Sequence, residues 1–162
     1  HIAAEELIQA KKKHILALFG HPQLSVTQKR VKAFEEVFQQ RAPQTKLTIQ
    51  YPYFIENSKQ TFLDAFKARQ KPDAVFCMGD MNLIGAMKAI HELNLSIPQD
   101  IGVIAISNGF LPTLFNPEIT FIETSGYRLG KTAFAQMKLR LENSQVIENV
   151  CVPATLNRRG SL

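Results

Sequence analysis

Apolar segments of strand length alternate with segments of helical periodicity along the whole chain. Several of the short segments are apolar at nearly every position, which is typical of strands covered on both faces of a sheet. The expected strands are 14–20, 46–54, 74–79, 102–107, 120–124 and 149–156.

The intervening segments place apolar side chains at helical spacing. Within 25–41, Val31, Phe34 and Phe38 form one stripe, and 57–69 and 126–142 have the same pattern. Strands that alternate with amphipathic helices predict a doubly wound α/β fold, in which a mostly parallel sheet lies between two helical layers.

Composition narrows the class of protein. The chain has 162 residues, 45% of them hydrophobic, which suits one compact globular unit. Its net charge of +5 is scattered, except at Lys11–Lys13, where cations complement a helix end better than they form a nucleic-acid patch. Cys77 and Cys151 lie far apart in the sequence, so we expect them to be reduced thiols, which favours the cytoplasm. Because His1 already lies in a helical pattern, without an initiator Met or signal peptide, we treat the chain as a fragment or processed product.

The sequence lacks the common catalytic motifs. It contains no G-x-S-x-G, H-E-x-x-H, phosphate-binding loop or dinucleotide fingerprint, and its four histidines do not pair at metal-ligand spacing. We therefore expect no enzyme, no metal site and no cofactor.

Polar residues follow the expected strands where ligands collect in open α/β sheets. Asp80 follows 74–79, Ser107 ends 102–107, and Asn108 comes directly after it. Helix capping and turn formation are the alternatives for these residues. Arg30 lies one turn before Phe34, so its guanidinium can reach a cleft, and a solvent-exposed surface arginine is the alternative.

The helix expected at 81–94 has apolar residues on two faces. Met81 and Ile84 begin the second face, with Lys88 interleaved, and Phe115 in the following loop can join it. Such a helix packs on its own sheet and on a second subunit, which predicts a dimer interface. Burial under the 108–119 loop is the alternative.

The order of motifs from "PDAVFCMGDMNLIGAMKAI" through "IPQDIGVI" and "NPEIT" to "GYRLGKTAF" and "LNRRGS" resembles the LacI/GalR family of transcriptional regulators. The resemblance covers the C-terminal part of their effector-binding domain. It implies a periplasmic-binding-protein-like fold, with two subdomains hinged around a small-molecule cleft. It also implies a cytoplasmic homodimer that binds a sugar-like effector and contacts DNA through a headpiece absent from this chain.

The resemblance also implies a division of the chain into subdomains. Residues 22–121 resemble the C-terminal subdomain, 1–21 and 125–145 resemble pieces of the N-terminal subdomain, and 146–162 resembles the closing strand and tail.

The resemblance also assigns ligand contacts. Arg30 matches an arginine that contacts effector, and Phe54 matches a stacking aromatic. The chain departs from the family at other positions. Gly79 replaces an Asn before Asp80, Ser107 replaces an acid that grips sugar hydroxyls, and Thr124 replaces a Gln. The implied ligand residues are Arg30, Phe54, Gly79, Asp80, Ser107, Asn108 and Thr124, and Ile84 and Phe115 match dimer-interface positions.

Two other functions share this architecture. A secreted sugar-binding protein of a transport system has the same fold and is distinguished by a signal peptide in place of a DNA headpiece. A flavodoxin-like enzyme would need a cofactor loop or nucleophile that the sequence does not contain.

Overall fold

A six-stranded sheet with the order β2-β1-β3-β4-β5-β6 organises the protein. The computed structural model describes residues 1–142 and 149–162. Neighbouring strands from β2 to β5 are parallel, and β6 is antiparallel to β5. The strands are β1 (His14–Leu18), β2 (Lys46–Gln50), β3 (Ala74–Cys77), β4 (Gly102–Ser107), β5 (Thr120–Glu123) and β6 (Thr155–Asn157).

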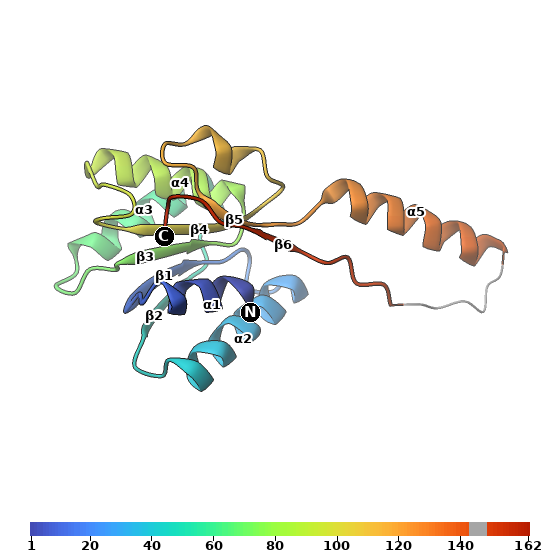
Figure 1. Cartoon of the computed structure of the whole chain (residues 1–162), viewed down its shortest axis with the longest axis horizontal. Coiled ribbons are helices and arrows are strands. Elements are labelled where there is room, and N and C mark those ends of the chain that lie inside the picture. The colour runs from blue at the N-terminus through green and yellow to red at the C-terminus, as the bar shows by residue number, and fades with distance from the viewer. Residues whose placement is uncertain (143–148) are drawn as a thin grey trace.

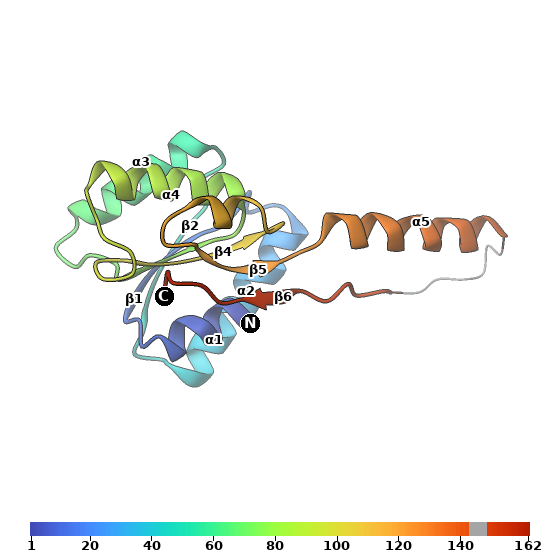
Figure 2. The ribbon, with the colours of Figure 1, turned by 45° about the horizontal axis from the view of Figure 1, so that its top comes forward.

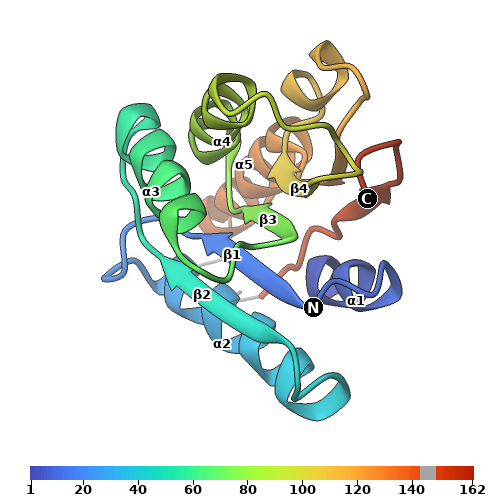
Figure 3. The ribbon, with the colours of Figure 1, turned by 90° about the vertical axis from the view of Figure 1, so that its left-hand side faces the viewer.

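Helices cover both faces of the sheet (Figures 1 and 3). α1 and α2 pack over one face, where Phe34 stacks on Phe76 at 4.9 Å. α3 and α4 pack together over the other face, around Phe62 and Leu83. The α/β architecture with a mostly parallel sheet is therefore confirmed. The helices are α1 (Ile2–Gln9), α2 (Ser25–Arg41), α3 (Ile55–Lys67), α4 (Asp80–Glu92), a short 3-10 helix η1 (Leu111–Leu114) and α5 (Gly126–Glu142).

Most expected elements occur at the expected places, but the strands are shorter. β1 and β3 are buried at every position, as their apolar composition predicted. Only the end of the strand expected at 149–156 is extended and paired, as β6. Residues 143–148, which fall within the expected segments 125–145 and 146–162, lie outside the described residues.

The beginning of the chain is part of the central sheet. β1 lies between β2 and β3, and Ala4 and Leu7 of α1 are fully buried in the same core as Phe38. The expected boundary at residue 21 thus differs from the packing, because β1 hydrogen-bonds to strands of the 22–121 segment on both sides.

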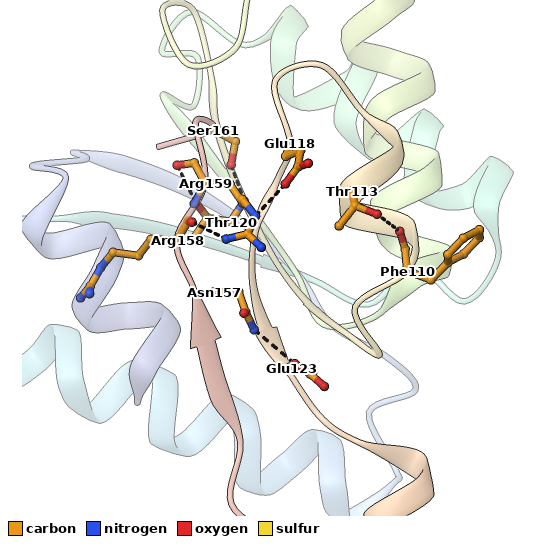
Figure 4. A network of polar contacts seen from close by, with 9 residues as sticks. All are labelled: Phe110, Thr113, Glu118, Thr120, Glu123, Asn157, Arg158, Arg159 and Ser161. Atoms are coloured by element: carbon orange, nitrogen blue, oxygen red, sulfur yellow. Dashed lines mark hydrogen bonds and ion pairs between the residues drawn. The ribbon is translucent and has the colours of Figure 1, made fainter.

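The C-terminal tail closes the sheet beside β4 and β5 (Figure 4). The Ser161 hydroxyl donates to the Val103 carbonyl at 2.6 Å and accepts from the Thr120 amide at 2.8 Å. Arg158 donates twice to Glu6 of α1, at 2.8 and 2.7 Å. The last residues therefore connect the sheet to the helical layer.

α5 extends away from the rest of the protein (Figures 1 and 2). None of its residues is buried. Leu129, Met137 and Leu141 of its apolar stripe are largely exposed, and so is Phe134, which follows Ala133 of the same stripe. The apolar stripe that predicted this helix consequently has no cover within the described part of the chain.

Candidate functional site

The order in which the chain adds strands to the sheet reverses between β1 and β3, and this topological switch point locates the candidate site. β1 leads through α2 to β2 on one side, whereas β3 leads through α4 to β4 on the other. Helices on opposite faces separate at such a point, so a crevice forms outside the carboxyl ends of the strands. Ser107 is the last residue of β4 and the other six candidate ligand residues come after a parallel strand, so all seven lie along this one edge.

Arg30 and Thr124 line one cavity of about 440 Å³. Arg30 comes from the second turn of α2, and Thr124 comes directly after β5. The wall between them is mostly apolar and includes Phe34, Phe76 and Ile106. The volume lies within the range of ligand sites, roughly 300–1,000 Å³. The complete lining is His1, Ile2, Ala3, Lys29, Arg30, Ala33, Phe34, Phe76, Ile106, Ile122, Thr124 and Ala154.

Arg30 is a half-buried cation. Burial lowers the pKa of its guanidinium, because desolvation penalises the charged form. No hydrogen bond or ion pair joins this side chain to any residue that the structure describes. As far as the described residues are concerned, its five donors are therefore available to a ligand.

Phe54 lies outside this cavity, at the start of α3. It is 59% exposed and contacts Tyr53 edge to face, with ring centroids 4.6 Å apart. Tyr53 in turn meets His21, which follows β1. The exposed rings of Tyr53 and Phe54 form an apolar platform beside the carboxyl ends of β1 and β2.

Gly79 and Asp80 form the start of α4. Gly79 occupies the N-cap position, no side chain caps the helix, and Asp80 is its first residue. The capping alternative for Asp80 is therefore wrong. Its Oδ1 atom is buried and has no hydrogen-bond partner among the described residues. A Cβ atom at Gly79 would meet nothing within 4 Å, so space at this edge does not require glycine.

Ser107 and Asn108 hold the turn after β4. The Ser107 hydroxyl accepts from the Gly109 amide and the Asn108 Oδ1 accepts from the Phe110 amide, each at 3.2 Å. Gly109 has a φ of 101°, which favours glycine at this turn. Both side chains thus have the structural role that was the alternative to ligand contact.

Sequence reasoning missed three residues at this edge. Lys29 lines the cavity beside Arg30. Thr27 is fully buried, and its Oγ1 has no partner among the described residues. Asn82 donates to the Pro52 carbonyl at 3.3 Å and to the Ser58 hydroxyl at 3.1 Å, which ties α4 to the loop before Phe54. Thr27 and Lys29 lie on an ordinary helix, so only their nearness to Arg30 could have marked them.

The candidate dimer residues lie on α4 and in the loop after β4. Met81 is 50% exposed and Ile84 is partly exposed. Lys88 pairs with Glu56 of α3. Phe115 is half-buried against the core beneath α4. The surface therefore combines apolar side chains with an ion pair between two helices.

Residues 1–142 and 149–162 contain no cluster of three potential metal ligands. In the same residues, no helix combines the length and apolarity needed to span a membrane.

Comparison with known proteins identifies relatives over most of the chain. A family model described as a periplasmic binding protein-like domain matches residues 4–162. The HTH-type transcriptional repressor PurR of Vibrio vulnificus is 27% identical over 151 residues, which are 90% of this chain and 44% of that protein. PurR of Pectobacterium carotovorum is 41% identical over 95 residues, 56% of this chain and 27% of that protein. The chain thus spans less than half the length of these relatives.

Solved structures share the fold. A putative LacI transcriptional regulator from Bacillus cereus superposes with a TM-score of 0.90 at 20% identity, over 99% of this chain and 58% of that one. A LacI-family regulator from Enterococcus faecium with bound ribose gives 0.88 at 18% identity, over 99% and 60%. The dimeric Lac repressor gives 0.87 at 21% identity, over 98% and 58%.

Proposed function

Because the chain belongs to the periplasmic binding protein-like domain family and corresponds to part of a LacI/GalR-type effector-binding domain, we propose that it senses a small-molecule effector for a DNA-binding regulator. The curated relatives are transcriptional repressors. By this proposal the chain is a binding module and not an enzyme, and the whole protein acts in the cytoplasm.

The observation that carries this proposal is the half-buried Arg30, which has no partner among the described residues and lies in a cavity at the carboxyl edge of a parallel sheet. Ligands bind at this edge in doubly wound folds. In the proposed site, Arg30 is the main polar contact, Thr124 is a second one, and Phe54 is an apolar platform. Gly79, Asp80, Ser107 and Asn108 complete the edge, although the turn bonds of Ser107 and Asn108 favour a supporting role.

We propose that the cleft closes on its ligand between two subdomains. Residues 22–121 with β1 form one subdomain, and 125–145 belong to the other, whose remaining elements lie outside this chain. This assignment accounts for the exposed apolar stripe of α5. A ligand that binds the closed state more tightly shifts the population toward it, in proportion to its differential affinity.

α4 offers a connection between ligand and dimer. Its first residue, Asp80, lies at the ligand edge, and the same helix exposes Met81 and Ile84. We propose that Met81, Ile84, Lys88 and Phe115 contact a second copy, so that a shift of α4 on ligand binding changes the dimer and the spacing of its DNA headpieces. The Lac repressor structures that share this fold are dimers, one of them bound to operator.

The alternative is an exported sugar-binding protein of a transport system. The encoded sequence upstream of His1 separates the two, since a helix-turn-helix followed by further α/β sequence supports the regulator and a cleavable signal peptide supports the exported protein. The biochemical test uses the protein encoded by the whole gene. We expect this protein to bind a DNA fragment from its own promoter region, and we expect a small molecule to change its affinity for that fragment. A whole protein that retains no such fragment would contradict the regulator.

A further inference from the structure

The charged side chains that line the candidate cavity in the described structure are all positive. Lys29 and Arg30 both line it, and none of its described lining residues is Asp or Glu. The nearest acid along β5, Glu123, accepts a hydrogen bond from Asn157 at 3.4 Å. Asp80 follows β3 and is not among the lining residues. Among the described lining residues there are therefore two cations and no carboxylate to balance them.

Arg30 differs from the other arginines of the described chain. It is the only one that is not classed as exposed. Arg41, Arg158 and Arg159 each pair with a glutamate, although water could solvate them. A partly desolvated cation without a partner is costly, and an anion that enters the cavity removes this cost.

The rest of the cavity is suited to the apolar part of a small organic ligand. Phe34, Phe76 and Ile122 form its apolar wall, and Thr124 supplies one hydroxyl. A ligand with several hydroxyls needs several convergent acceptors and donors, which this wall does not provide. The Ser107 hydroxyl, at the position where the resemblance implies a sugar-gripping acid, already accepts from Gly109.

We propose that this cavity takes a small organic anion, in which a carboxylate or phosphate group contacts Arg30 with Lys29 nearby and a compact apolar body lies against Phe34 and Phe76. The assignment rests on the proposed effector-sensing function and replaces the sugar-like effector that the resemblance implied. The planar fork of arginine matches either anion with two parallel hydrogen bonds.

A matched pair of probes tests the charge directly. Benzoate and benzamide have nearly the same shape and differ in charge, and each is titrated into the full chain at constant ionic strength while amide shifts are followed by NMR. We expect saturable shifts at residues 29–34 and 124, with benzoate binding at least roughly tenfold more tightly, the usual effect of a charged hydrogen bond. Arg30→Gln should remove this preference, and Arg30→Lys should keep part of it.

Arg69→Gln is the matched control, because Arg69 is exposed beyond the end of α3, away from the cavity. It should leave the benzoate preference unchanged. The amide spectrum of each variant also reports whether it folds. Equal binding of the two probes, a preference that survives Arg30→Gln, or no saturable shift at the cavity would each overturn the proposal.

Neutral sugars separate this inference from the proposed function. Ribose and lactose are titrated in the same way into the wild-type chain and Arg30→Gln. A sugar that binds at the cavity with equal affinity in both would overturn the anionic assignment while effector sensing stands. Failure of the whole protein to retain promoter DNA would instead reject the regulator and leave the charge preference of the cavity intact.

Discussion

The C-terminal tail and α5 are close in sequence and differ completely in how they are held. The tail, residues 155–162, contains two arginines, yet Ser161 is 0% exposed and both arginines pair with glutamates. α5 carries a regular apolar stripe, yet Phe134 is 64% exposed and no residue of the helix is buried. Apolar periodicity thus indicates a helix, but the cover for its stripe depends on the rest of the protein. The tail is held by polar bonds that no periodicity reveals.

The largest effect should come from removing the tail's central hydroxyl. Ser161→Ala leaves the Val103 carbonyl and the Thr120 amide without their side-chain partner in a buried position. We expect a loss of about 2 kcal/mol in the free energy of unfolding, measured by urea denaturation. Thr113→Val is the control, because Thr113 is exposed in η1, where its hydroxyl donates to the Phe110 carbonyl, and the loss of this bond should matter little. Equal losses in the two variants would contradict the central role of Ser161.

A smaller effect is expected where the tail meets α1. The Glu6 carboxylate is largely buried and accepts two hydrogen bonds from Arg158. Glu6→Gln keeps the shape and removes the charge, so we expect about 1 kcal/mol of destabilisation, decreasing at high salt because Arg158 is exposed. Urea unfolding at low and high NaCl measures both. A loss that salt does not change would indicate packing rather than charge.

The free energy of unfolding should depend on pH through a histidine of the sheet, His14 in β1. Desolvation is the largest cause that lowers the pKa of His14, which is buried in β1 with Nε2 2.9 Å from the Thr48 hydroxyl. The unfolded chain, with a pKa near 6.5, therefore binds more protons below that pH. Stability should fall as pH drops below about 6.5 and level off below the folded pKa.

His14→Gln tests this pH dependence by removing its source. The free energy of unfolding of wild type and variant is compared between about pH 7.5 and about pH 5. His91→Gln is the control, since His91 is exposed on α4. An unchanged slope in His14→Gln would assign the pH dependence to other groups.

The same comparison shows what sequence can predict. The buried strands β1 and β3 and the helices α2 and α5 follow from apolar patterns, because each pattern reflects local geometry. Arg30 and Thr124 were both predicted as ligand residues, but Lys29, which lines the same cavity, was not. Its place there depends on how α2 lies relative to the end of β5, which is far from it in the sequence. The capping alternative for Asp80 failed because Gly79 takes that position, a difference of one residue that composition does not decide.

In this chain the smallest effect is expected on α5, and its comparison with the whole protein tests why this helix is uncovered. Phe134→Lys exchanges an exposed ring for a charge, so the free energy of unfolding of this chain should change by less than about 0.5 kcal/mol. In the protein encoded by the whole gene, the same change should cost more than about 2 kcal/mol if α5 packs into the second proposed subdomain. Lys131→Ala, on the same helix, is the control in both proteins, because it removes no apolar contact. A small effect of Phe134→Lys in both proteins would mean that the stripe is uncovered in the whole protein too, and α5 would then have to be excluded from the second subdomain.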